Sequence, residues 1–286
     1  MKGSTAFQRI VIIGYGKITG EIITYVMKRR EEYGYRLEAV EHEAHSLSIT
    51  EKLCREAGVP FARIENKKEL AAYLDSFSEK TLIVSASNNF LFPKPFVEKE
   101  NITIVNFHNA LLPAYPGRNA PSWAIFMGEK ETGVTWHYVT AGVDEGNIIV
   151  QKRCEIGADT KAYELAEQLM ELARAAFTEC FDAVLAERAE ARPQRFDEKR
   201  RMYRSCETPA DGFFKITEEP ERIYRLLRSM DYGKNGIFQP ARTVIDGKRA
   251  EVLRYRKIAG EKREAEGFLF LPLADGNLLK IKYRML

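Results

Sequence analysis

An amide, an imidazole and a carboxylate lie close together in one stretch of the sequence, residues 102–151. Asn106 and His108 end a β-branched run and are separated by Phe107. Because alternate residues of an extended strand point to the same side, their side chains are expected to share one face. Asp144 follows in a Gly-Val-Asp-Glu-Gly turn, whose glycines let the backbone approach a ligand closely. These three residues are the candidate catalytic group.

The three residue types suit acyl transfer to an amine. An amine that attacks an acyl carbonyl creates a negatively charged oxygen and must lose a proton. Asn106 can donate a hydrogen bond to that oxygen, a contact typically worth about 3 kcal/mol of the barrier. His108 can accept or relay the proton, because an imidazole titrates near pH ~6.5. Asp144 can orient the ring and raise its pKa.

Hydrophobic periodicity indicates the elements that position these residues. Residues 9–13 form a β-branched run that ends in Gly-Tyr-Gly, and apolar residues at helical spacing follow, which predicts strand, tight turn and helix. Strands that alternate with helices favour a parallel sheet, with ligands at the carboxyl ends of its strands. Further strands are expected at residues 37–40, 81–85, 102–106, 133–139 and 147–156, and helices at 49–57, 67–77, 162–189 and 220–230.

The expected fold class is therefore α/β: a Rossmann-like parallel sheet with helices on both faces, plus a small C-terminal mixed or β-rich domain. The runs at 133–139 and 147–156 are expected to form a hairpin-like excursion beyond the parallel core. We expect a catalytic domain at residues 1–190, a charged linker at 191–205 and the small domain at 206–286.

Composition excludes several classes of protein. The chain has 286 residues, with 44 basic and 41 acidic side chains, a balance without a nucleic-acid footprint. Its four cysteines lie far apart, so neither a disulfide framework nor a zinc knuckle is expected. Charged residues interrupt every apolar run before it could span a bilayer. A cytoplasmic enzyme that does not contact membranes is the expectation.

Three motifs, in this order and at this spacing, resemble the signature of the 10-formyltetrahydrofolate-dependent formyltransferases. They are Asn-x-His at 106–108, Leu-Leu-Pro at 111–113 and Asp-x-Gly-x-Ile at 144–148. That family includes glycinamide ribonucleotide, methionyl-tRNA and amino-sugar formyltransferases. The resemblance covers residues 8–190, with a weaker similarity at 208–212 to the start of the C-terminal part of the methionyl-tRNA and amino-sugar members. Ala110 stands where the family often has serine, outside the catalytic three.

The resemblance implies 10-formyltetrahydrofolate as co-substrate, no metal, and Asn106, His108 and Asp144 as the catalytic residues. It also implies two loops whose backbone groups read the pterin edge, and a glycine turn that faces the amine substrate. The implied cofactor-binding residues are Asn88, Asn89, Phe90, Leu91, Phe92, Val139, Thr140, Ala141, Gly142 and Val143, and the implied substrate-binding residues are Gly14, Tyr15, Gly16 and Lys17.

The amine acceptor is indicated by residues 117–137. This stretch looks closer to formyltransferases of amino acids, hydroxyornithine-type siderophore precursors and peptide-synthetase-linked aminoacyl groups than to the purine enzyme, and amino-sugar members have a related pattern. A small-molecule or carrier-tethered amine is therefore expected, acted on by an enzyme that can form a homodimer. Methionyl-tRNA is the alternative, because that enzyme resembles this chain in its two-domain plan.

Other readings of the same residues compete with this one. Gly14, Gly16 and Gly20, with Glu38 or Glu41 as a ribose-binding acid, suit a bound dinucleotide, although one glycine pattern is weak evidence. Taken alone, His108 reads as a structural histidine. A folate- or nucleotide-sensing module without turnover and a folate hydrolase would share much of the same site.

Three further features admit two readings each. His42 and His45 suggest a metal site, but their spacing is one residue short of His-Glu-x-x-His, so solvated loop histidines are favoured. The basic run at 198–204 is read as a solvated linker or as a tRNA contact. Trp123 and Trp136 are expected in the core or a pocket wall rather than as stacking platforms.

Overall fold

The computed structural model describes residues 5–42, 48–197, 201–234, 236–261 and 264–286. The chain divides into two compact units. The first comprises Met1–Gly117, Gly133–Cys154 and Gln168–Arg201, and the second comprises Arg118–Thr132, Glu155–Glu167 and Met202–Leu286. No helix among the described residues is both long and apolar enough to cross a membrane.

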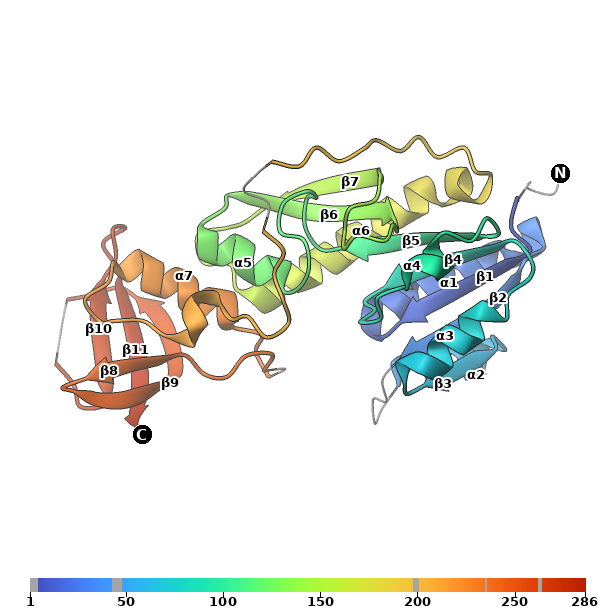
Figure 1. Ribbon diagram of the computed structural model, residues 1–286. Coiled ribbons are helices and arrows are strands. Elements are labelled where there is room, and N and C mark those ends of the chain that lie inside the picture. The colour runs from blue at the N-terminus through green and yellow to red at the C-terminus, as the bar shows by residue number, and fades with distance from the viewer. Residues whose placement is uncertain (1–4, 43–47, 198–200, 235, 262–263) are drawn as a thin grey trace. The chain divides into compact units, whose positions relative to one another are not determined.

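A seven-stranded sheet in the order β3-β2-β1-β4-β5-β6-β7 forms the first unit (Figure 1). Strands β1 to β5 run parallel, and β6 pairs antiparallel with β5. The strands are β1 (Arg9–Gly14), β2 (Arg36–His42), β3 (Phe61–Ile64), β4 (Thr81–Ala86), β5 (Ile102–His108), β6 (Glu131–Tyr138) and β7 (Ile148–Glu155). The helices are α1 (Gly16–Tyr33), α2 (Ile49–Ala57), α3 (Lys67–Asp75), α4 (Lys94–Val97) and α6 (Ala162–Leu185).

Helices cover both faces of this sheet, which explains why β1 and β4 are apolar almost throughout. On one face, Leu70 and Leu74 of α3 and Phe96 of α4 join the core formed with β1, β4 and β5. On the other face, Tyr25 of α1 makes edge-on ring contacts with Phe177 of α6. The predicted fold class is thereby confirmed, including the antiparallel excursion beyond the parallel strands.

The register of the strands decides where polar groups meet. Ile13 of β1 pairs with Ser85 of β4, and Ser85 pairs with Asn106 of β5. Asn106 in turn pairs with His137 of β6. Because directly paired residues point to the same face, the carboxyl ends of the parallel strands β4 and β5 and the antiparallel neighbour β6 bring polar side chains into one row.

Helix α6 ends at Leu185, so the prediction that it reaches residue 189 is wrong at its C-terminus. Glu187 adopts a positive φ of 52°, its N–H bonds to the carbonyl of Val184, and the N–H of Arg188 bonds to the carbonyl of Ala183. This pair of bonds is the Schellman arrangement that satisfies the last carbonyls of a helix and stops it. Sequence periodicity does not reveal such an end, because glutamate is not the usual residue for that position.

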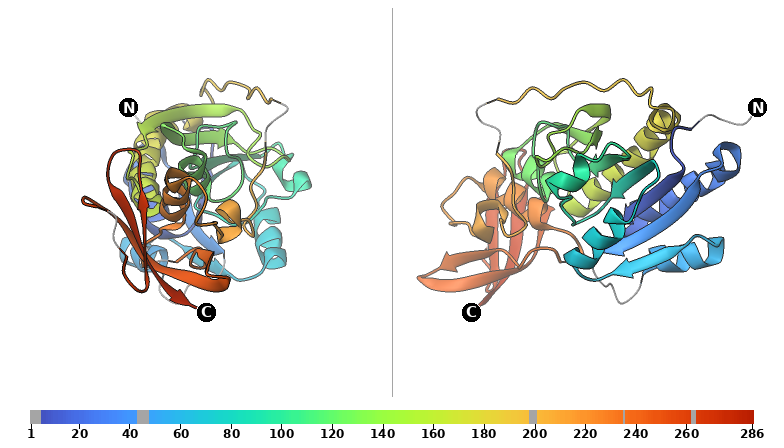
Figure 2. Two further views of the ribbon diagram at one scale, coloured as in Figure 1. Left: turned by 90° about the vertical axis from the view of Figure 1, so that its left-hand side faces the viewer. Right: turned by 45° about the vertical axis from the view of Figure 1, so that its right-hand side comes forward.

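The second unit contains a four-stranded antiparallel sheet in the order β10-β11-β9-β8. Figure 2 shows from two further directions that α7 lies against this sheet, where Ile223, Leu226 and Leu227 share a core with Leu279 and Ile281. The elements of this unit are α5 (Ala120–Met127), η1 (Pro209–Gly212), α7 (Pro220–Met230), β8 (Arg242–Ile245), β9 (Lys248–Ile258), β10 (Phe268–Pro272) and β11 (Leu278–Met285).

The sequence patterns did not predict the shortest elements. Strand β3 and helices α4 and α5 have between four and eight residues, too few to display a clear period. The reading of His42 as a solvated loop histidine is wrong, because it ends β2 with 4% of its surface exposed and its Nδ1 lies 3.0 Å from the carbonyl oxygen of Ile64. His45 lies outside the described residues.

Gly14 is required by packing at the end of β1. A Cβ at this position would lie 1.7 Å from the carbonyl oxygen of Ala86 in β4, so Gly14→Ala must push the two strands apart. We expect it to lower the free energy of unfolding by about 1–3 kcal/mol in urea titrations.

Gly20→Ala is the matched control. Its new Cβ would meet only Leu53 at 3.6 Å, and alanine is the better helix former, so stability should stay equal or rise by up to about 1 kcal/mol. Equal unfolding midpoints for the two variants would contradict the packing argument.

Candidate active site

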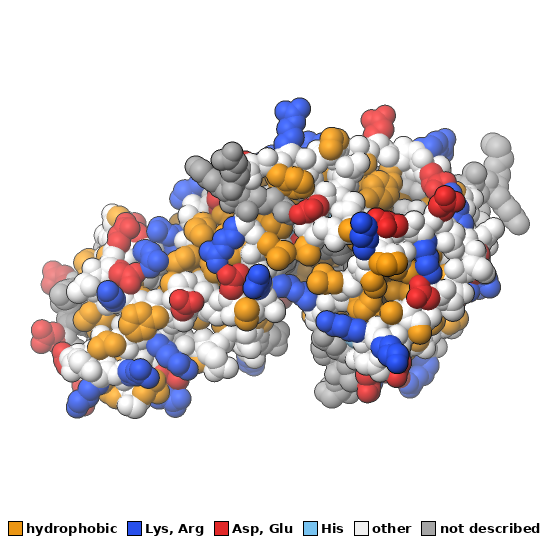
Figure 3. Space-filling model, viewed as in Figure 1, with side chains coloured by type: hydrophobic (Ala, Val, Ile, Leu, Met, Phe, Trp, Pro, Cys, Tyr) orange, Lys and Arg blue, Asp and Glu red, His pale blue; other side chains and the backbone are white. Residues whose placement is uncertain are grey.

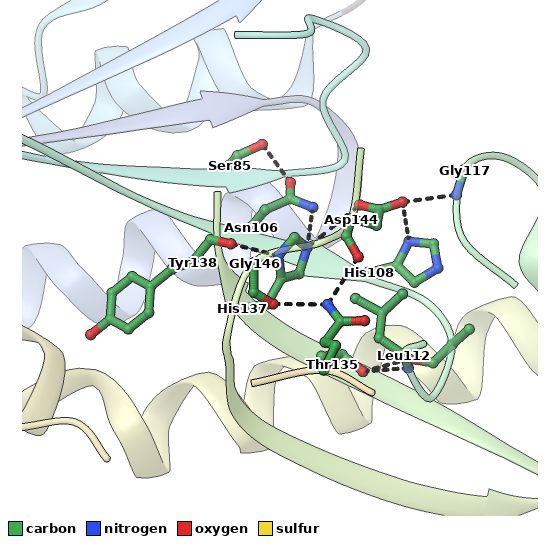
Figure 4. A network of polar contacts seen from close by, with 12 residues as sticks. Ser85, Asn106, His108, Leu112, Gly117, Thr135, His137, Tyr138, Asp144 and Gly146 are labelled. Carbon is green, nitrogen blue, oxygen red and sulfur yellow. Dashed lines mark hydrogen bonds and ion pairs between the residues drawn. The ribbon is translucent and has the colours of Figure 1, made fainter. Parts of the chain in front are cut away.

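Asn106 is held at both ends of its amide. Ser85 Oγ donates to Asn106 Oδ1 at 2.8 Å, and Asn106 Nδ2 lies 3.1 Å from His137 Nε2 (Figure 4). His137 Nδ1 lies 2.8 Å from the carbonyl oxygen of Tyr138, which can only accept, so the neutral ring carries its proton on Nδ1 and accepts the Asn106 N–H at Nε2. One N–H of the Asn106 amide therefore remains for a substrate oxygen.

The carboxylate of Asp144 is largely buried and faces one backbone N–H and two imidazole rings. The N–H of Gly117 donates to Oδ2 at 2.8 Å, His108 Nδ1 lies 3.4 Å from Oδ2, and His137 Nε2 lies 3.5 Å from Oδ1. Burial alone would raise the pKa of Asp144, but the two imidazole rings and the Gly117 N–H together hold that pKa well below its usual range. Asp144 is thus ionised at neutral pH.

His108 is buried, with 5% of its surface exposed, and both ring nitrogens face acceptors. Nδ1 faces Asp144, while Nε2 lies 2.8 Å from the carbonyl oxygen of Tyr115. A proton on either ring nitrogen can therefore be donated to an oxygen atom, on Asp144 or on the Tyr115 carbonyl. For His108 to take a proton from a substrate amine, the amine must displace the Tyr115 contact at Nε2.

The Leu-Leu-Pro loop between the two motifs is fixed to β6 and β7. Thr135 Oγ1 donates to the carbonyl of Ala110 at 2.7 Å and accepts the N–H of Leu112 at 3.1 Å. Gln151 Nε2 donates to the carbonyl of Leu112 at 2.9 Å. These bonds hold the loop that supplies both Tyr115 and Gly117 to the polar residues described above.

Residues 192–194, which are distant in sequence, hydrogen-bond to the segment that contains Asp144. Gln194 Nε2 donates to the carbonyl oxygens of Asp144 at 2.9 Å and Gly146 at 2.8 Å. Arg192 and Ile148 exchange both backbone hydrogen bonds, at 2.8 and 2.9 Å. Asp144 has a positive φ of 53°, a conformation disfavoured for non-glycine residues. The bonds from Gln194 stabilise the turn in that conformation.

The two loops that the family resemblance implies for the pterin meet in the structure. Asn88 forms a local turn with Phe90, and its Nδ2 lies 3.4 Å from Ser85 Oγ, which joins this loop to Asn106. Phe92 and Val139, one from each loop, pack on the cluster that contains Phe90. In contrast, the Leu91 side chain is 68% exposed. The predicted set is therefore brought together at Asn88, Phe90, Phe92 and Val139.

The glycine turn at residues 14–17 lies at the same edge of the sheet, because Gly14 pairs with Ala86 in the parallel register. Thr19 fixes this turn by donating to the carbonyl oxygens of Ala86 at 2.7 Å and Tyr15 at 3.0 Å. Lys17 forms an exposed ion pair with Glu171 at 3.7 Å. None of the contacts described for residues 14–17 joins them to Asn106, His108 or Asp144.

Sequence reasoning missed three residues of the polar network: Ser85, His137 and Gln194. Ser85 carried a signal, because it is a polar residue that follows an apolar run in the buried strand β4, whereas β6 contains other polar residues, so His137 did not stand out. Such a residue needs a hydrogen-bond partner, and paired strands supply it. Gln194 carried no signal, because it lies 50 residues from the turn that it supports.

The structure bears on the two candidate ribose-binding acids and on the two tryptophans. Glu38 accepts a hydrogen bond from the Tyr73 hydroxyl and pairs with Arg9, and Glu41 is buried with a bond from Ser48, so both carboxylates have protein partners. The expectation that the two tryptophans are core residues is confirmed: Trp123 and Trp136 have 4% and 0% of their surface exposed.

A metal ion would need clustered His, Cys, Asp or Glu side chains as ligands. Within the described part of the chain, His, Cys, Asp and Glu side chains form no group of three or more that could hold a metal ion. All four cysteines are free thiols. Of the basic run at 198–204, residues 198–200 lie outside the described part of the chain.

This chain is similar to known proteins over most of its length. Residues 3–181 match the family model described as formyl transferase. A methionyl-tRNA formyltransferase of Acidobacterium capsulatum is 29% identical over 238 residues, which cover 79% of this chain and 73% of that enzyme. A methionyl-tRNA formyltransferase of Geobacter sulfurreducens is 30% identical over 186 residues, which cover 64% of this chain but only 55% of that enzyme.

Among solved structures, an N-formyltransferase from Helicobacter canadensis, in complex with folinic acid and dTDP-3-aminofucose, has a similar fold. The TM-score is 0.71 at 15% sequence identity, and the match covers 96% of this chain and 99% of that one. The family match spans well over half of the sequence and includes all three motifs, so this chain belongs to the formyl transferase family and is an enzyme of that family.

Proposed function

We propose that this chain is an N-formyltransferase that moves a formyl group from 10-formyltetrahydrofolate to an amine, with Asn106, His108 and Asp144 as its catalytic residues. One observation carries the proposal: these side chains belong to a single connected polar network at the carboxyl edge of the sheet. Family membership supports the reaction class.

The network can do what formyl transfer to nitrogen requires. The new bond joins the amine nitrogen to the formyl carbon, the bond from that carbon to the donor nitrogen breaks, and one proton must move from amine to donor. Asn106 has an N–H free to stabilise the oxygen that becomes negative. His108 carries the proton, and ionised Asp144 stabilises the ring while it is charged.

The loops at residues 88–92 and 139–143 suit the folate donor, which supplies the activated formyl group. Phe90, Phe92 and Val139 offer an apolar, partly aromatic wall for a planar ring. The backbone N–H groups of Thr140 and Ala141 have no hydrogen-bond partner among the residues that the structure describes, so they can bind polar atoms at the edge of such a ring.

For the acceptor we propose a small-molecule or carrier-tethered amine, of the amino acid or amino-sugar nucleotide type. The pattern of residues 117–137 supports it, as does the likeness of almost the whole chain to an enzyme solved with an amino-sugar nucleotide. Methionyl-tRNA is the second candidate, favoured by the curated relatives. The test is a screen of amines and charged tRNA with 10-formyltetrahydrofolate, following release of tetrahydrofolate optically; turnover with none of them would refute the proposal.

Removal of either ionisable group should stop transfer without preventing donor binding. We expect His108→Ala and Asp144→Asn to lower kcat by about 10²–10⁴-fold, because both act on the proton rather than on the pterin. Titration with a folate analogue should give an unchanged dissociation constant. Normal turnover by either variant would overturn the assignment.

The rate should fall on the acid side of pH about 6, as the imidazole or the amine takes up a proton. Asp144 does not cause this limb, because a pKa held well below the usual range keeps the carboxylate ionised down to strongly acidic pH. Initial rates between pH about 4 and 9 test this. A flat profile, or a limb centred near the ordinary aspartate value, would contradict it.

Gln194 is expected to act as a positioning residue for Asp144. Gln194→Met removes both bonds to the Asp144 turn at nearly constant volume, and we expect kcat to fall by roughly 10- to 100-fold while KM for the donor changes little. Gln8→Met is the control, since Gln8 also bonds a backbone group, the N–H of Lys80, but far from the site. Equal kcat values for the two variants would show that Gln194 is only structural.

A further inference from the structure

The outer face of the sheet in the second unit carries four paired cations. On β11 and β9, Lys280 lies directly opposite Arg256, and Lys282 lies directly opposite Arg254. We call these four residues the cationic face. On the other side of β11, Phe270 pairs with Lys280, and Phe268 pairs with Lys282. Each of two adjacent rows thus consists of one aromatic ring and two positive charges.

A β-bulge directs these arginines outward. Lys282 pairs with Arg254 but Tyr283 pairs with Val252, so Leu253 is an extra residue on β9. Val252 faces the core, and without the extra residue strict alternation would place Arg254 and Arg256 on that same inward side. Because of the bulge, Tyr255 packs inward instead and both arginines reach solvent.

Like charges directly opposite each other destabilise a sheet. Within the described residues, none of the four side chains forms an ion pair with an acidic group, whereas their neighbours do: Arg284 pairs with Glu251, and Lys257 pairs with Asp159 and Asp275. Charges of both signs are likewise interspersed on the face of the molecule seen in Figure 3. The cationic face is therefore a local departure from a balanced surface.

The positive charge is confined to a small hollow. The four cations and Phe268 are among the residues that line a depression of about 110 Å³. Along β9 and β11, the cationic face lies between two uncharged rows. Beyond Arg254 and Lys282 lies the neutral Glu251–Arg284 pair, and beyond Arg256 and Lys280 lies the apolar pair of Leu278 and Ile258. Such a footprint suits a compact anion with several charges rather than a long charged backbone.

Aromatic rings beside the cations add a second element of recognition. The Nζ of Lys280 lies 4.2 Å from the centroid of the Phe268 ring and 5.4 Å from that of Phe270. An anion that binds Lys280 and displaces its ammonium group from the Phe268 ring would leave that ring free to contact a flat group on the same ligand. We infer that the cationic face is a binding site for a nucleoside diphosphate or a similar phosphorylated ring compound, separate from the polar network around Asp144.

The test is calorimetric titration of the full chain with UDP, ADP and inorganic pyrophosphate at low salt. We expect saturable binding that weakens as salt rises. Arg254→Gln/Arg256→Gln should weaken it at least about tenfold, since each lost contact is a charge-assisted bond. Arg249→Gln, the same change at the far end of β9, should leave it unaltered, and His108→Ala should retain it.

The melting temperature provides an independent readout. Removing like charges that face each other should leave the melting temperature of Arg254→Gln/Arg256→Gln equal to or above that of the unmodified protein, even as binding is lost. Three results would overturn the inference: no saturable binding of any of the three compounds, equal affinity in the double variant, or binding of an RNA oligonucleotide without binding of the small phosphates.

Discussion

The buried carboxylate of Asp144 is the constraint that organises the first unit. An ionised group removed from water must be compensated by the groups that face it. These groups come from separate parts of the chain: the N–H of Gly117 from the Leu-Leu-Pro loop, the ring of His108 from β5 and the ring of His137 from β6. Each of these groups must be held in place for the charge to be tolerated. The anchoring of the loop by Thr135 and the closing of the turn by Gln194 are therefore consequences of the same burial.

The register of the sheet provides the remaining polar contacts. Ser85, Asn106 and His137 lie in one row across β4, β5 and β6, so a hydroxyl, an amide and an imidazole are brought together by backbone pairing rather than by flexible loops. A row of this kind leaves little freedom to the Asn106 amide, since one end accepts and the other donates. Pre-organised donors are effective in catalysis because they need not reorient as charge develops.

The sequence predicted the parallel core, α2, α7 and the three motif residues, because each depends on local pattern or on motif spacing. It did not predict what depends on pairing between distant segments. His137 has no motif of its own and becomes part of the site only because β6 runs antiparallel beside β5. Gln194 lies in a segment read as a charged linker, and its role arises from contact with a turn 50 residues earlier. The predicted end of α6 was wrong for a different reason: the residue that terminates the helix is a glutamate in a conformation usually occupied by glycine.

The polar network around Asp144 and the cationic face differ in how their charges are balanced, and we propose different functions for them. Around Asp144 the negative charge is balanced inside the protein, and in the function that we propose this site moves a proton. On β9 and β11 the positive charges oppose one another, and no acidic side chain in the described part of the chain offsets them. In our proposal a bound anion compensates these charges. The bulge at Leu253 strengthens this argument, because regular alternation would have avoided the outward arginines, and the irregular strand instead brings them next to Lys280 and Lys282.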